Sequence, residues 1–260
     1  MEIARTVFDR EVIAEFLPPF SHQRSRARPA RKSKKHKVLI LCQGVPSVPR
    51  HKELLHFISR KGFWVFFPRY RGSWESRGKF LRKSPHEDIL DIINQLPRGF
   101  RDSRKEKTVK LKPDKVFLIG SSFGGPAAIL ASKDKRVDKV VCLSPVIDWQ
   151  AQQRTTEPLD WLEKFIKRYF GRAFDFSAED WRKLKKGSFY NPIAEIKRLD
   201  GKKIFIIHAK DDKVVSYKPA QKFAKLTSCK LKLLKTGGHL GLSFLMKNSS
   251  FTQTVLKFLN

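Results

Sequence analysis

The chain has 260 residues, of which 40% are hydrophobic and 12% aromatic, enough to bury one large core. No run approaches the ~18 consecutive apolar residues of a membrane span. Residues 1–10 are charged where a secretory signal would be apolar, and the cysteines form no metal-ligand pattern. We therefore expect a soluble cytoplasmic protein with no membrane span, metal or other cofactor.

The net charge is +30, from 55 basic and 25 acidic residues. Such a charge attracts nucleic acids and anionic membranes through a long-range field and counterion release. Basic residues are densest in 24–37 and 98–115, but neither stretch alternates aromatic residues with its cations as a base-stacking surface would. No specific nucleic-acid partner is expected, and no feature indicates an oligomeric state.

Residues 6–17 alternate in polarity, which predicts an antiparallel hairpin that Pro18 and Pro19 end. Short and mostly continuous apolar runs then recur, typical of strands that are covered on both faces in a parallel sheet. They are 38–42 (VLILC), 63–67 (FWVFF), 116–119 (VFLI), 140–143 (VVCL), 204–207 (IFII) and 231–234 (LKLL).

Helical stripes separate these runs. Ser84 begins a capping box that Glu87 closes, with Pro85 at the first helical position. Apolar residues then follow with helical spacing, as they also do in 54–58, 223–226 and 255–259. Alternating strands and helices predict an α/β fold, with one mostly parallel sheet and helices on both faces.

One segment breaks this alternation. Residues 149–197 contain no buried-strand run but carry aromatic residues among charges, including Trp161, Phe165, Tyr169 and Phe170. We expect a helical cap, or lid, inserted within a single domain that spans residues 1–260. Its aromatic residues either pack onto the core or form an apolar face toward lipid, and packing is the preferred interpretation.

The turn 120–124 (GSSFG) has three possible chemistries. A dinucleotide fingerprint requires glycine where Ser122 stands, and a phosphate loop requires Lys-Ser/Thr where the chain continues 126–128 (PAA). The third, G-x-S-x-G, requires a strand before it and tiny residues two positions either side of the serine, which Gly120 and Gly124 supply. Ser122 is therefore the candidate nucleophile, with a packing turn as the alternative.

A nucleophilic serine needs a base and an acid that orients the base, later in the chain and after strands. His239 lies in a glycine-flanked loop after the run 231–234, and Asp212 follows the run 204–207. Asp211 and Asp148 compete with Asp212 for the acid. The oxyanion hole is expected from the backbone N–H groups of Phe123, next after the serine, and Val45, because Pro46 has no N–H.

These motifs in combination resemble the α/β-hydrolase fold, in the branch of prolyl-oligopeptidase-like hydrolases and small carboxylesterases. The resemblance rests on 120–125 (GSSFGG), 208–215 (HAKDDKVV), 237–241 (GGHLG) and the loop 70–78, and it extends over residues 37–259. It implies a catalytic triad of Ser122, Asp212 and His239. The sequence departs from the family pattern at Gln43, where histidine is usual, and at Ala209, where glycine is usual.

We therefore expect a serine carboxylesterase that hydrolyses small-molecule esters of short to medium acyl chains through an acyl-enzyme. The alternatives are a serine peptidase or aminopeptidase of the same branch, a lipase, and a basic nucleic-acid-binding protein on a hydrolase scaffold. The positive net charge argues against binding a cationic peptide N-terminus.

Overall fold

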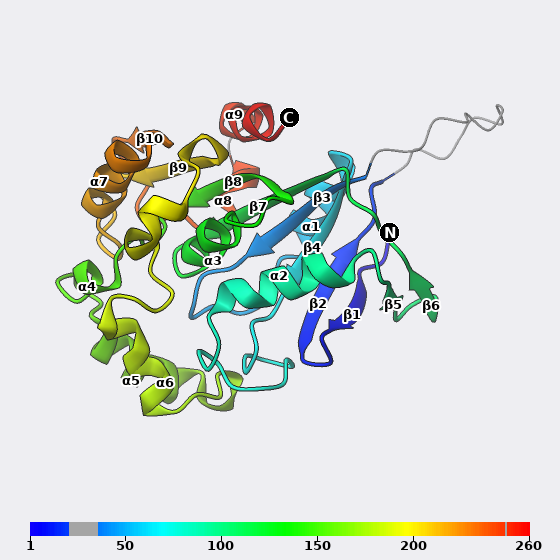
Figure 1. Cartoon of the computed structure of the whole chain (residues 1–260), viewed down its shortest axis with the longest axis horizontal. Coiled ribbons are helices and arrows are strands. Elements are labelled where there is room, and N and C mark those ends of the chain that lie inside the picture. Colours follow the sequence, from blue (N-terminus) through cyan, green and yellow to red (C-terminus); the bar gives the residue numbers. More distant parts are fainter. Residues whose placement is uncertain (21–35, 248) are drawn as a thin grey trace.

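The computed structural model describes residues 1–20, 36–247 and 249–260. Its centre is an eight-stranded sheet of order β1-β2-β4-β3-β7-β8-β9-β10 (Figure 1). The hairpin of β1 and β2 pairs antiparallel with β4, and all later pairings in that order are parallel. The strands are β1 Ala4–Phe8, β2 Val12–Leu17, β3 Lys37–Cys42, β4 Phe63–Pro68, β7 Lys115–Ser121, β8 Val137–Leu143, β9 Ile204–Ala209 and β10 Lys230–Leu234.

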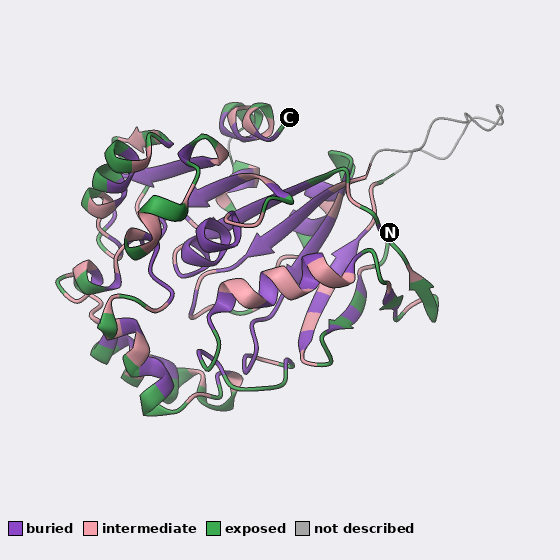
Figure 2. Cartoon of the chain, viewed as in Figure 1, coloured by how far each residue is buried: buried purple, intermediate pink, exposed green. Residues whose placement is uncertain are grey.

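Helices cover both faces of this sheet. Successive strand residues point to opposite faces, so Leu118 joins one buried cluster and Ile119 the other. The first cluster is covered by α2 Pro85–Gln95, α3 Gly124–Ala131 and α7 Tyr217–Thr227, and the second by α1 Lys52–Arg60, α8 Phe244–Lys247 and α9 Ser249–Leu259. Figure 2 shows the central strands buried between these layers. The predicted α/β fold with a mostly parallel sheet is confirmed.

Helix α2 begins as its sequence predicts. Ser84 and Glu87 form the reciprocal capping box, and Pro85 occupies the first turn. Just before this helix along the chain, Arg71 anchors the loop that follows β4. Its amide donates to Asp88 Oδ2 at 2.8 Å, and its guanidinium lies 2.8 Å from Asp91 Oδ2. The same guanidinium pairs with Asp9 of the β1–β2 turn, so one buried cation joins hairpin, loop and helix.

The basic stretch 98–115 forms a small hairpin that its sequence did not indicate. Strands β5 Phe100–Asp102 and β6 Lys107–Val109 pair antiparallel, and Phe100 inserts its ring into the core. Strands of this length carry too few residues for a recognisable alternation. Most of the other basic stretch, 24–37, lies outside the described residues.

The segment between β8 and β9 is helical, as expected. It contains α4 Trp149–Gln152, α5 Leu159–Tyr169, η1 Gly171–Ala173, α6 Ala178–Arg182, η2 Lys183–Lys186, η3 Pro192–Arg198 and η4 Gly201–Lys203. Trp149 and Trp181 are buried, and their indole N–H groups donate to the carbonyls of Tyr190 and Leu159 at 2.7 and 3.0 Å. In Figure 1, α5 and α6 lie beyond one end of the strands. The division into one domain with a cap stays a prediction.

None of the helices in the described ranges is both long and apolar enough to cross a bilayer.

Candidate active site

Ser122 occupies a sharp turn between β7 and α3. Its φ is +50°, a left-handed conformation that non-glycine residues rarely adopt. A Cβ on Gly120 would lie 2.3 Å from the carbonyl oxygen of Gly124, and one on Gly124 would lie 2.1 Å from that of Cys42. Only glycine therefore allows strand, turn and helix to pass this closely, as the G-x-S-x-G pattern predicts.

Backbone hydrogen bonds hold Ser122 in this conformation. Its amide donates to the Leu143 carbonyl at 3.0 Å. Its own carbonyl accepts from the amides of Gly125 at 3.0 Å and Val146 at 3.2 Å. The neighbouring strand β8 and the first turn of α3 thus fix the serine from both sides.

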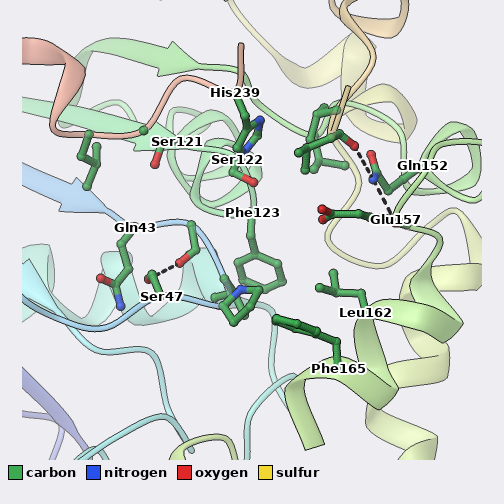
Figure 3. Close-up of a pocket in the computed structure, with 18 of the residues that line it drawn as sticks. Gln43, Ser47, Ser121, Ser122, Phe123, Gln152, Glu157, Leu162, Phe165 and His239 are labelled. Atoms are coloured by element: carbon green, nitrogen blue, oxygen red, sulfur yellow. Dashed lines mark hydrogen bonds between the residues drawn. The ribbon is translucent and has the colours of Figure 1, made fainter. Parts of the chain in front are cut away.

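His239 and Asp212 come together in front of this turn. Asp212 lies in the loop after β9 and His239 in the loop after β10, because parallel strands bring their carboxyl ends to one edge of the sheet. His239 Nδ1 is 2.9 Å from Asp212 Oδ2. Figure 3 shows His239 beside Ser122 at one end of a pocket that both residues line.

The Asp212 carboxylate is stabilised in its charged form. Burial by itself raises the pKa of Asp212, but hydrogen bonds from His208 and His239 and the amide of Val215 bring that pKa well below its usual range. Asp212 Oδ1 accepts from the amides of Val214 and Val215, both at 3.0 Å. A fixed anion that faces His239 can orient the imidazole and stabilise its protonated form.

His208 is a second histidine at this carboxylate, and no role for it was expected from the sequence. It is fully buried, and its Nε2 lies 3.2 Å from Asp212 Oδ2 and 2.9 Å from the Val215 carbonyl. Both neighbours accept hydrogen bonds, so Nε2 carries the proton. Its Nδ1 has no hydrogen-bond partner among the described residues. Its place four residues before Asp212 was the available signal.

The two competing acids take other positions. Asp211 accepts hydrogen bonds from the amides of Gly237 at 3.2 Å and Gly238 at 2.9 Å, so it tethers the loop that carries His239. Asp148 caps α4 by accepting from the Gln150 amide at 2.9 Å. In the described structure, Asp212 is the only one of these three carboxylates that is hydrogen-bonded to His239.

The loop 43–47 lies against the serine, and hydrogen bonds stabilise it. A Cβ on Gly44 would be 3.1 Å from Ser122 Cβ. The Ser47 hydroxyl donates to the Gly44 carbonyl at 2.6 Å, and the Tyr70 hydroxyl donates to the Gln43 carbonyl at 3.1 Å. Val45, within this loop, lines the pocket. The loop is thus positioned to present a backbone donor near Ser122.

Phe123 is fixed by its aromatic side chain. Its ring centroid lies 5.0 Å from that of Tyr190, 5.4 Å from Phe80 and 5.6 Å from Trp149. The Tyr190 hydroxyl donates to the Phe123 carbonyl at 2.6 Å. Phe123 precedes the first turn of α3, where amide groups lack intrahelical acceptors, so its N–H is available to an anion.

A cavity of about 400 Å³ opens above Ser122. Its walls come from the loop 43–47, from the loop after β9 that carries Asp212, from the loop after β10 that carries His239, and from the helical segment between β8 and β9. Most of that segment's contribution is apolar: Trp149, Trp161, Leu162 and Phe165. The same segment also contributes Glu157, which the sequence analysis did not identify and whose carboxylate points into the pocket in Figure 3.

The described ranges contain neither a cluster of candidate metal ligands nor an exposed cysteine. No group of three or more histidine, cysteine or carboxylate side chains there is arranged to hold a metal ion. Cys42, Cys142 and Cys229 are buried, and burial raises the pKa of each thiol. These cysteines act as small hydrophobic residues.

Solved structures with the same fold include hydrolases of several kinds. An esterase from Pyrococcus furiosus has a TM-score of 0.66 at 16% identity, covering 99% of this chain and 90% of its own. A sugar hydrolase from Lactococcus lactis has a TM-score of 0.63 at 15% identity, with both chains covered completely. An acylaminoacyl peptidase from Pyrococcus horikoshii has a TM-score of 0.60 at 17% identity, covering 95% of this chain but 38% of its own.

No curated protein matches the sequence significantly. Residues 50–259, most of the chain, match the prolyl oligopeptidase family. Together with the parallel sheet and the glycine-flanked serine turn, this match shows that the protein is an α/β-hydrolase of the prolyl oligopeptidase family.

Proposed function

We propose that the protein is a serine carboxylesterase that hydrolyses small-molecule carboxylic esters with short to medium acyl chains. The observation that carries this proposal is the 2.9 Å hydrogen bond between His239 and Asp212, next to a serine held at positive φ in a largely apolar pocket. Ser122 is assigned as nucleophile, His239 as base and Asp212 as the acid that orients it.

The reaction proceeds by two acyl transfers. Ser122 Oγ attacks the ester carbonyl while its proton passes to Nε2 of His239, whose Nδ1 is engaged by Asp212. The amides of Phe123 and Val45 donate to the developing oxyanion. Collapse breaks the bond to the alcohol, which takes the proton from His239. Water then attacks the acyl-enzyme by the same route, releasing the acid and restoring Ser122.

Pocket dimensions support small esters. A cavity of about 400 Å³ is near the lower end of the range for small-molecule sites. The esterase from Pyrococcus furiosus is matched over 90% of its length, whereas the acylaminoacyl peptidase is matched over 38%, so much of that peptidase has no counterpart in this chain. Hydrolysis of an amide would use the same triad and remains the alternative within this family.

The test is hydrolysis of p-nitrophenyl esters from acetate to palmitate by wild type and Ser122→Ala. We expect a rate that peaks at short or medium chains and falls at least about 10⁴-fold in the variant. Circular dichroism and thermal unfolding check that the variant stays folded.

A fluorophosphonate that reacts with activated serines gives a second readout. Wild type and Ser121→Ala should each be labelled, and Ser122→Ala should not, because the neighbouring Ser121 lies on β7 before the turn. Esterase activity or labelling that survives in Ser122→Ala would refute the assignment. A rate that peaks at palmitate would instead favour the lipase alternative.

A further inference from the structure

The pocket differs in charge from the rest of the molecule. Lysine and arginine number 55 of 260 residues, yet none of the described residues that line the pocket is a lysine or arginine. Glu157 is the only aspartate or glutamate in that lining. The site is therefore locally acidic on a strongly basic protein, and it offers no cation to an anionic substrate.

The Glu157 carboxylate has no hydrogen-bond or ion-pair partner in the described part of the chain. Among the described residues, no hydrogen bond or ion pair reaches either of its oxygens, although lysines elsewhere pair readily with carboxylates. Glu157 is half-buried, and burial raises the pKa of its carboxyl group. The nearby His239 imidazole lowers that pKa, but no lysine or arginine of the described residues pairs with the carboxylate, so a cation that binds beside it would offset the cost of its burial.

The backbone around Glu157 is fixed to the acid loop. Gln152 Nε2 donates to the Glu157 carbonyl at 3.2 Å and to the Val214 carbonyl at 3.0 Å. The Thr156 hydroxyl donates to the Lys213 carbonyl at 2.7 Å. These bonds hold the residue at a set distance from the loop of Asp212, and Figure 3 shows its side chain directed toward Ser122. Its position is thus built into the site.

Aromatic rings line the same cavity. Trp161 and Phe165, one turn apart on α5, stack with ring centroids 4.9 Å apart. The faces of such rings attract cations, most strongly where water is excluded. A carboxylate and aromatic rings in one pocket favour the same kind of ligand group.

We propose that Glu157, with Trp161 and Phe165, forms a subsite for a positively charged nitrogen of the substrate. The preferred substrates are then esters or amides that carry an ammonium group in the acyl part or in the leaving group. This inference rests on the proposed hydrolysis at Ser122 and narrows its substrate class. It differs from the expectation, drawn from net charge, that a cationic peptide N-terminus is disfavoured, because the local lining and not the total charge faces the substrate.

The test compares substrates that differ only in charge. Acetylthiocholine and uncharged 3,3-dimethylbutyl thioacetate place the charge in the leaving group. The p-nitrophenyl esters of alanine and isobutyric acid place it in the acyl part. In Glu157→Gln, which keeps the size of the side chain, kcat/KM for the cationic member of at least one pair should fall tenfold or more, with less than a twofold change for its neutral partner.

Glu163→Gln is the matched control, since Glu163 lies on α5, pairs with Lys167 at 2.7 Å and does not line the pocket. Glu163→Gln removes the same charge and should leave the ratio of kcat/KM for the cationic over the neutral substrate unchanged in both pairs. Equal effects of the two variants on both pairs would overturn the subsite while leaving ester hydrolysis intact.

Binding is measured separately from turnover. Tetramethylammonium is titrated by ligand-observed NMR against Ser122→Ala with and without Glu157→Gln. Loss of tetramethylammonium binding with Glu157→Gln supports the subsite even if the wild type hydrolyses no ester. The absence of ester hydrolysis would refute only the proposed activity. Equal binding to both proteins would overturn the subsite.

Discussion

At the scale of single residues, adjacent carboxylates have different tasks. Asp212 is hydrogen-bonded to the imidazole of His239, while Asp211 accepts hydrogen bonds from the backbone of the loop that carries this histidine. In the proposed mechanism the first interaction requires a negative charge, because it stabilises the imidazolium that forms during the reaction. The second uses the two carboxylate oxygens only as hydrogen-bond acceptors, and an amide side chain provides one of these two acceptors.

Replacing each carboxylate by its amide separates these tasks. We expect Asp212→Asn to lower kcat by about 10³ to 10⁴-fold, because the amide no longer stabilises the imidazolium and permits the wrong tautomer. Asp211→Asn keeps an acceptor for only one of the two amides, of Gly237 and Gly238, that its two oxygens now accept from, so it loosens the loop but should cost less than about tenfold. Steady-state hydrolysis of p-nitrophenyl butyrate measures both. An Asp211→Asn variant as impaired as Asp212→Asn would contradict the division.

Residues differ in how far sequence can predict them. Ser122 was predictable because the glycines around it express a steric demand within a few positions of the chain. The positions of His239 after β10 and of Asp212 after β9 were predictable, but the sequence did not show that Asp212, and not the adjacent Asp211, is hydrogen-bonded to His239. Glu157 was not predictable, since its importance depends on which residues it faces across the pocket.

At the scale of elements, helix α5 presents different residues to the pocket and to solvent. Trp161, Phe165 and Tyr169 recur every fourth residue; the rings of Trp161 and Phe165 stack with centroids 4.9 Å apart, and the Tyr169 ring lies tilted 4.8 Å from that of Phe165. Phe165 lines the cavity, whereas Tyr169 is 64% exposed and does not. The aromatic series thus continues from the pocket wall onto the surface.

This placement predicts which ring limits substrate length. Phe165→Ala should raise the ratio of kcat/KM for decanoate over butyrate esters at least about tenfold, because it opens space for several methylene groups. Tyr169→Ala, on the same helix and outside the cavity, should leave the ratio unchanged. The p-nitrophenyl ester series measures both variants, and thermal unfolding checks their stability. An unchanged ratio in Phe165→Ala would show that chain length is limited elsewhere.

Strands and long helices were predictable because each has a strong local signal. The apolar runs matched β3, β4, β7, β8, β9 and β10, and the capping box marked the start of α2. The β5–β6 hairpin and the 3-10 turns of the segment 149–197 escaped prediction. These pieces are short, and tertiary contacts such as the buried indoles of Trp149 and Trp181 determine their conformation.

At the scale of the whole molecule, charge and chemistry are separated in space. The net charge of +30 creates a field that attracts polyanions, but no lysine or arginine lies among the described residues of the pocket. Polyanions should therefore bind outside the catalytic pocket. A subsite that binds cations can coexist with this field because nearby charges and excluded water dominate inside a cavity.

Binding of a fluorescent single-stranded oligonucleotide tests this separation. We expect its affinity to fall at least about tenfold as salt rises from about 50 to about 200 mM. The lysine and arginine side chains release counterions condensed on the oligonucleotide, and this release becomes less favourable as the salt concentration rises. A saturating amount should leave hydrolysis of p-nitrophenyl butyrate unchanged, because the neutral ester enters a pocket without basic residues. Anisotropy measures the binding, and the ester assay is run in the same buffers. Competitive inhibition by the oligonucleotide would place nucleic acid at Ser122 and favour the alternative of a basic nucleic-acid-binding protein on a hydrolase scaffold.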